Sequence, residues 1–184
     1  MFILYFKKGD LYTKSINMIV LQGMCYSGKT TLGAILAREY NIPFIDSRDL
    51  FQRVHNMSET EYLSSRGREA FCNAEKESIR QITLEKDNMV LSLGGSACYY
   101  EAEMEALKKH HTVIWLNVAF PEIQRRREAE GTDRPIVFPE GIETFQQLYR
   151  QRKELYGEYC HVEIEVENQT PIKEVVQKIV SQMP

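Results

Sequence analysis

The chain has 184 residues, of which 43% are hydrophobic and 27% are charged, with only 10 glycines and 6 prolines. This composition is typical of one globular domain and argues against a collagen-like or disordered chain. The 23 basic and 26 acidic side chains give a formal net charge of −3, which argues against a general nucleic-acid-binding protein.

Short apolar runs alternate along the chain with longer stretches whose apolar residues recur at helical spacing. The runs predict buried strands at 18–21, 42–46, 89–93, 112–116 and 162–166. The longer stretches predict helices at 32–39, 58–86, 101–108, 121–127, 142–159 and 171–181, with a loop over the Gly- and Pro-containing segment 129–141. This alternation predicts an α/β fold of three layers, in which a parallel five-stranded sheet lies between two layers of helices.

The first 17 residues carry no clear hydrophobic period. We interpret residues 1–17 as an N-terminal extension and residues 18–184 as a single domain without internal repeats. Met18 opens the first predicted strand, so a chain that begins at this methionine is expected to fold.

Residues 23–30 fit the phosphate-loop pattern G-x-x-x-x-G-K-[ST], with a predicted strand before them and a predicted helix after them. The glycines let successive backbone N–H groups point at phosphate oxygens, and the helix N-terminus adds its positive end. Lys29 brings a full charge to the terminal phosphates, and the Thr30 hydroxyl is a suitable ligand for Mg²⁺. The expected phosphate-binding residues are Gly23, Ser27, Gly28, Lys29, Thr30 and Thr31.

A phosphate loop specifies a nucleotide but no particular reaction, because small-molecule kinases, GTPase switches and transport ATPases share it. A chain of 184 residues with an arginine-rich segment late in the sequence favours a small kinase. Such an enzyme must close a lid over the phosphates to exclude water.

Further segments follow the phosphate loop in the order in which one kinase family has them. They are Phe44-Ile45-Asp46-Ser47-Arg48, Gly67-Arg68-Glu69-Ala70-Phe71-Cys72-Asn73-Ala74-Glu75, Gly94-Gly95-Ser96, Arg127 with Arg134-Pro135, Arg152-Lys153-Glu154-Leu155-Tyr156, and Pro171. From about Met18 onward the chain resembles shikimate kinase, a member of the nucleoside-monophosphate-kinase-like group. The resemblance implies transfer of the γ-phosphoryl group of ATP, with Mg²⁺, to a hydroxyl group of shikimate.

The nucleotide half of the family pattern is well matched. By resemblance, Arg127 and Pro171 lie on either side of the adenine, and Arg134 swings in with a lid at about 127–138. A guanidinium group there would stabilise the charge on the transferring phosphoryl group. Asp46 is expected to hold Mg²⁺ through water or to accept the proton of the attacking hydroxyl. Lys29, Asp46 and Arg134 are therefore the expected catalytic residues, whereas Arg125 and Arg126 are interpreted as a solvated helix end.

The acceptor half departs from the family pattern at three positions. Arg48 replaces the second aspartate of F-x-D-x-D, Cys72 replaces the arginine that binds the carboxylate of shikimate, and Ser96 replaces a third glycine. An arginine cannot accept hydrogen bonds from a diol, and loss of a charged contact that leaves its partner unpaired costs about 2–5 kcal/mol. The expected acceptor-binding residues are Asp46, Arg48, Gly94, Gly95, Ser96 and Arg152.

Three hypotheses therefore stay open: a shikimate kinase with a rearranged pocket, a kinase for another small hydroxylated or anionic metabolite, and a nucleotide-binding protein without catalysis. The intact Lys29 and Arg134 argue against the third, because nucleotide binding alone requires no lid arginine. The four cysteines form no C-x-x-C pair and are interpreted as reduced thiols. No apolar run reaches the roughly 18–20 residues of a membrane span. We expect a cytoplasmic monomer that binds a small-molecule substrate and neither nucleic acid nor membrane.

Overall fold

The structure is a computed structural model that describes residues 18–84, 88–131 and 136–183. Within these residues, five parallel strands form one sheet in the order β2–β3–β1–β4–β5. In chain order the strands are β1 (Ile19–Gln22), β2 (Phe44–Asp46), β3 (Val90–Ser92), β4 (Thr112–Val118) and β5 (Val162–Val166).

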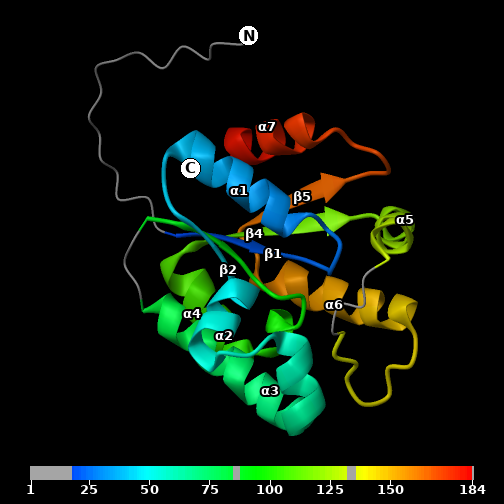
Figure 1. The fold of residues 1–184 in the computed structure, drawn as a ribbon. Helices are drawn as coiled ribbons and strands as arrows, with labels where there is room; N and C mark the ends of the chain where they lie inside the picture. Colours follow the sequence, from blue (N-terminus) through cyan, green and yellow to red (C-terminus); the bar gives the residue numbers. More distant parts are fainter. Residues whose placement is uncertain (1–17, 85–87, 132–135, 184) are drawn as a thin grey trace.

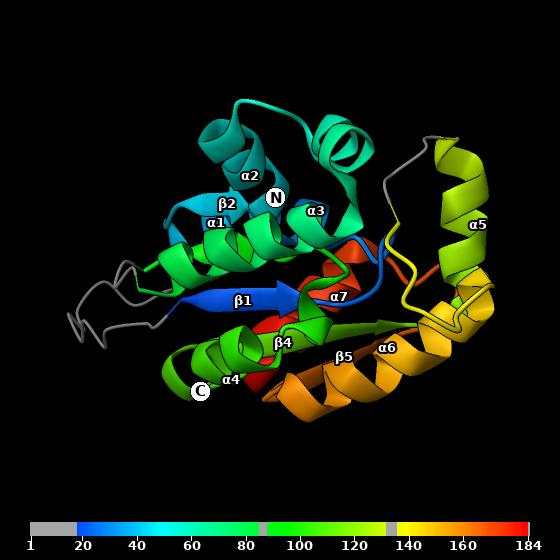
Figure 2. The same ribbon diagram turned by 90° about the horizontal axis from the view of Figure 1, so that it is seen from below.

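Helices cover both faces of the sheet. They are α1 (Lys29–Tyr40), α2 (Ser47–His55), α3 (Glu59–Thr83), the 3-10 helix η1 (Ala97–Tyr99), α4 (Glu101–His110), α5 (Phe120–Glu130), α6 (Phe145–Tyr159) and α7 (Ile172–Gln182). Figure 1 shows α1 and α7 on one face and α3, α4 and α6 on the other, and the turned view in Figure 2 agrees. The predicted three-layer α/β fold is therefore confirmed. Among the described residues, none of the helices has the length and apolar character needed to cross a membrane.

The central strand β1 shows why both faces must be covered. Ile19 and Leu21 belong to a buried cluster that includes Leu36 of α1 and Ile179 of α7. Val20, which points to the opposite face, belongs to a second cluster with Ile79 of α3 and other residues of α3 and α4. A strand buried on both faces has no polar alternation, which is why the sequence presents it as a continuous apolar run.

Three elements differ from the predicted ones. Helix α2 was not predicted, because Asp46, the last residue of β2, is also its N-cap and accepts a hydrogen bond from the Arg48 N–H. Helix α3 contains an interruption at Gly67, whose φ of 80° is left-handed. Helix α5 runs to Glu130 before Gly131 ends it, so the start of the predicted loop 129–141 is helical.

The register of the sheet brings the sequence motifs together. Leu21 of β1 and Asp46 of β2 both pair with Ser92 of β3. The phosphate loop follows β1, Asp46 ends β2, and Gly94 follows β3, so all three lie at the carboxyl edge of the sheet. This edge is where parallel α/β sheets place their ligands.

Candidate active site

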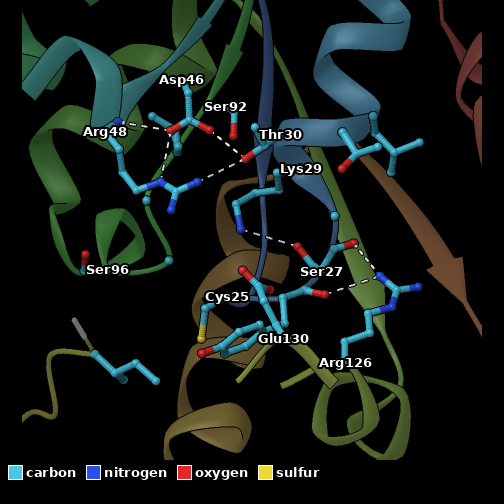
Figure 3. A pocket seen from close by; sticks show the side chains of 18 of the residues that line it. Cys25, Ser27, Lys29, Thr30, Asp46, Arg48, Ser92, Ser96, Arg126 and Glu130 are labelled. Carbon is cyan, nitrogen blue, oxygen red and sulfur yellow. Dashed lines mark hydrogen bonds and ion pairs between the residues drawn. The ribbon is translucent and has the colours of Figure 1, made fainter. Parts of the chain in front are cut away.

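A pocket of about 560 Å³ lies at the carboxyl edge of the sheet (Figure 3). Most of the predicted site residues line it: Ser27, Gly28, Lys29, Thr30, Thr31, Asp46, Arg48, Gly94, Gly95, Ser96 and Arg152. Gly23, Arg127 and Pro171 are described but are not among the lining residues. Arg134 lies outside the described residues, so its predicted place in the lid stays a prediction.

The phosphate loop between β1 and α1 depends on its two glycines. Gly23 has a φ of +144°, and a Cβ atom there would lie 2.8 Å from the Leu116 carbonyl oxygen. Gly28 has a φ of +92° and is the N-cap of α1. Both conformations are strained for any side chain, so the curl of the loop requires glycine at these positions.

The Lys29 ammonium group lies inside the curl of the loop. Its Nζ donates to the Gly23 and Met24 carbonyl oxygens, each at 2.8 Å, and to the Ser27 Oγ at 3.3 Å. The residue is only 8% exposed. Its charge is therefore fixed beside the helix N-terminus, at the place where an anion would be bound.

Thr30, Asp46 and Arg48 form a small network beside the loop (Figure 3). The Thr30 hydroxyl donates to the Asp46 Oδ2 at 2.7 Å. The Arg48 side chain donates from Nε to the Asp46 Oδ1 and from Nη2 to the Thr30 Oγ1, both at 3.4 Å. A hydroxyl group and a carboxylate that could contact a metal–nucleotide are thus already aligned with one another.

The environment of Asp46 keeps this carboxyl ionised. Burial alone would raise its pKa, but hydrogen bonds from Thr30 and the Arg48 N–H, together with the Arg48 charge, outweigh burial. The net result is a pKa below the ordinary value of 3.8. Asp46 is therefore negatively charged at neutral pH and able to attract a cation or accept a proton.

Helix α5 contacts the phosphate loop through Arg126. The Arg126 Nη1 donates to the carbonyl oxygens of Tyr26 at 3.3 Å and Ser27 at 3.0 Å, and its Nε donates to the Glu122 carboxylate at 2.7 Å. Hydrogen bonds from Arg125 and Arg126 lower the pKa of the buried Glu122 to about 2. The interpretation of Arg126 as a solvated helix end is therefore wrong, because its 27% exposed side chain joins α5 to the loop.

The two residues predicted to lie beside the adenine are placed differently. The Arg127 guanidinium lies over the Phe145 ring, 4.6 Å from its centroid. Pro171 is the N-cap of α7 and is exposed, while its neighbours Thr170 and Ile172 line the pocket. Their contacts with adenine stay predictions.

The acceptor side of the pocket contains a buried carboxylate that sequence reasoning did not select. Glu75 accepts hydrogen bonds from the Ser96 hydroxyl, at 2.9 and 2.8 Å, and from the Tyr100 hydroxyl. Burial raises the pKa of Glu75, and these bonds and the Arg152 charge offset only part of that effect. The family arginine that would stand nearby on α3 is Cys72 here, so neutral hydroxyl groups satisfy this carboxylate.

Arg152 of α6 lines the same pocket as the phosphate loop and is only 2% exposed. Its Nη2 donates to the Val137 carbonyl oxygen at 2.9 Å, and its Nε donates to the Tyr99 hydroxyl at 3.4 Å. A Cβ atom on Gly95 would lie 3.0 Å from the Arg152 Nη1. Glycine at position 95 therefore lets the backbone pass close to a buried guanidinium group, which provides a positive floor for an anionic acceptor.

A kinase has to bring a nucleotide and an acceptor together in one pocket, and here the phosphate loop and the buried Arg152 line one pocket. Fold and pocket thus define a P-loop kinase for a small molecule. The family model described as shikimate kinase matches residues 26–184. The chain belongs to the shikimate kinase family.

Individual relatives agree with this assignment. A shikimate kinase from a Sulfurihydrogenibium species is 30% identical over 164 residues, which cover 88% of this chain and 96% of the relative. One from Francisella tularensis subsp. novicida is 31% identical over 168 residues, covering 91% and 93%. The crystal structure of shikimate kinase from Acinetobacter baumannii in complex with shikimate superposes with a TM-score of 0.79 at 28% identity, covering 90% of this chain and 92% of that one.

Proposed function

We propose that this chain transfers the γ-phosphoryl group of ATP to a hydroxyl group of shikimate. The observation that carries the proposal is the shared pocket, into which both the phosphate loop with Lys29 and the floor with Gly95 and Arg152 open. Relatives named shikimate kinase that span most of this chain support it, as does the related structure solved with shikimate.

The oxygen atoms of Thr30 and Asp46 fit a magnesium ion. They lie 2.7 Å apart, and Mg²⁺ prefers a few protein oxygens combined with phosphate oxygens and water. Within the described residues no group of three or more His, Cys, Asp or Glu side chains is placed to form an all-protein metal site. When bound, Mg²⁺ would neutralise charge on the β- and γ-phosphates.

In the proposed reaction the side chains and backbone of the protein position the nucleotide and the acceptor and stabilise the charge on the transferring phosphoryl group. Lys29 and the loop N–H groups bind the β- and γ-phosphates, and Asp46 accepts the proton of the attacking hydroxyl. Arg134 reaches the transferring phosphoryl group as a lid at about 127–138 closes and expels water, a role that rests on the family resemblance. Arg127, whose guanidinium group lies over the Phe145 ring, and Pro171 are proposed to contact the adenine.

A second candidate is the same reaction with another small hydroxylated or anionic acceptor. The altered acceptor side of the pocket favours this candidate. Cys72 provides no guanidinium group for a carboxylate, and Arg48 cannot accept hydrogen bonds from the hydroxyl groups of a diol. In this candidate the nucleotide half works unchanged, and only the acceptor differs.

The decisive experiment is an ATP-consumption assay with shikimate beside a panel of hydroxy acids and polyols. Turnover with shikimate at millimolar concentration supports the first candidate. Absence of turnover with shikimate, together with clear turnover with another compound, decides for the second.

A Lys29→Ala variant tests whether the chain is a catalyst at all. Without the ammonium group the β- and γ-phosphates lose their fixed cation, so we expect turnover to fall below detection while the circular dichroism spectrum is unchanged. Full activity of this variant would contradict the assignment of the phosphate loop.

A further inference from the structure

The Arg48 guanidinium group lies where a nucleotide-bound metal would meet the protein. Its Nη2 is 3.4 Å from the Thr30 Oγ1 and its Nε is 3.4 Å from the Asp46 Oδ1 (Figure 3). We propose that Arg48 occupies the metal position in the nucleotide-free protein and competes with Mg²⁺ for the pair formed by Thr30 and Asp46. This inference rests on the proposed use of a metal-bound nucleotide.

The Arg48 guanidinium group and a bound Mg²⁺ ion would repel each other because they would lie close together. Mg²⁺ binds oxygen at about 2.1 Å, so an ion on the Thr30 Oγ1 would lie no more than about 5.5 Å from the Arg48 Nη2. Two positive charges at such a distance, next to a carboxylate that is only 5% exposed, repel each other with little screening. The Thr30 oxygen also accepts a hydrogen bond from Arg48, which lies on the atom that a metal ion would bind.

Departure of the Arg48 side chain would leave Asp46 in place. The carboxylate is also held by the backbone N–H of Arg48, 3.0 Å from Oδ1, and by the Thr30 hydroxyl on Oδ2. The Arg48 side chain itself is 40% exposed, so it can move into solvent without opening the core. The network therefore has a fixed part, the oxygen pair, and a part that can be displaced, the guanidinium group.

Loss of the Arg48 charge should accordingly raise the affinity of the metal. The probe is Mn²⁺ with the protein in excess over ADP, so that nearly all ADP is protein-bound, and free Mn²⁺ is measured by electron paramagnetic resonance. We expect Arg48→Met, which keeps an unbranched side chain without the charge, to bind Mn²⁺ about tenfold more tightly than the wild type, within the usual range of coupling between two ligands. Arg48→Lys retains a charge and should stay closer to the wild type.

Arg53→Met is the matched control. Arg53 lies on the same helix, is exposed and donates to the Asp49 carbonyl oxygen, so its loss changes the net charge equally without touching the oxygen pair. We expect its Mn²⁺ affinity to lie within about twofold of the wild type, since a distant exposed charge is screened by salt.

Equal Mn²⁺ affinity in Arg48→Met and wild type would overturn the inference, as would an equal gain in Arg53→Met. In both cases the proposed function would stand, because metal and ADP would still bind. If neither wild type nor variants bound Mn²⁺ with ADP, the proposed function would fail and the inference with it. Should Arg48→Met not fold, as judged by circular dichroism, the comparison is made with Arg48→Gln.

Discussion

At the scale of single residues, the acceptor side of the pocket departs from the family pattern at Cys72 and Ser96. A cysteine at position 72 removes a guanidinium group from the neighbourhood of Glu75, and a serine at position 96 brings a hydroxyl group that donates to the same carboxylate. A buried carboxylate without donors is costly, and the Ser96 and Tyr100 hydroxyl groups supply those donors here. The acceptor side of the pocket thus differs from the family pattern, and its buried carboxyl group has hydrogen-bond donors within the protein.

Restoring the family pattern at this place takes two changes, one at position 72 and one at position 96. In Cys72→Arg with Ser96→Gly, the new guanidinium replaces the serine hydroxyl beside Glu75 and can bind a carboxylate. We expect the KM for shikimate to fall at least about tenfold, since a charged contact of this kind is worth a few kcal/mol. The Cys72→Ser variant is the control, and an unchanged KM in the double variant would show that shikimate does not bind at this place.

Glu75 also predicts a pH dependence of stability. Its folded-state pKa is raised above the ordinary value of 4.5, so the folded protein binds this proton more tightly than the unfolded chain does. The stability linked to this group is present below pH 4.5 and is lost as the pH rises through the raised pKa. Glu75→Gln stays uncharged and should lose this part of the slope when urea unfolding is compared between pH 4.5 and 8. Parallel curves for wild type and variant would contradict the raised pKa.

At the scale of secondary-structure elements, α5 is anchored to the phosphate loop through Arg126. Tyr26 has a left-handed φ of 65°, and the carbonyl oxygens of Tyr26 and Ser27 accept hydrogen bonds from Arg126. Because the buried Glu122 orients that guanidinium group, α5 stabilises the curl of the loop from outside. Arg126 is therefore a positioning residue for nucleotide binding.

The role of Arg126 can be tested by comparing it with its neighbour on α5, Arg127. Arg126→Ala should weaken ADP binding about tenfold, because two loop carbonyl groups lose a charged donor that is worth about 1.5–3 kcal/mol. It should leave the KM for the phosphoryl acceptor unchanged. Arg127→Ala, which removes a contact with the Phe145 ring, is the comparison, and isothermal titration of ADP is the measurement. If Arg127→Ala had the larger effect, the resemblance-based placement of Arg127 at the adenine would be favoured instead.

The elements that the sequence predicted are encoded by local patterns, whereas the features that it missed depend on a residue with two roles or on contacts between distant residues. The strands and the phosphate loop are encoded locally, by apolar runs buried on both faces and by a fixed spacing of glycines and lysine. Helix α2 was missed because Asp46 ends a strand and caps a helix at once. The contacts of Arg126 with the loop and of Glu75 with Ser96 join residues far apart in the chain. Only the folded sheet brings such residues together, so no local pattern reveals them.

At the scale of the whole molecule, the sheet order makes β1 the central strand, between β3 and β4. The described structure begins one residue earlier, at Met18, whose side chain is 1% exposed and whose carbonyl oxygen accepts a hydrogen bond from the Thr112 N–H. All the strands and helices described above therefore lie within the predicted domain 18–184. The contribution of residues 1–17 is therefore tested by measuring whether the chain folds without them.

We expect the chain of residues 18–184 to fold and to bind ADP like the full chain. No strand or helix of the described structure is removed, so the midpoint of thermal unfolding should change by no more than about 4 °C, equivalent to about 1 kcal/mol. A chain of residues 22–184 is the control: it lacks Ile19 and Leu21, which are fully buried in the central strand, and should not fold. An unfolded 18–184 chain would mean that the preceding residues belong to the domain, whereas a folded 22–184 chain would mean that β1 does not hold the two halves of the sheet together.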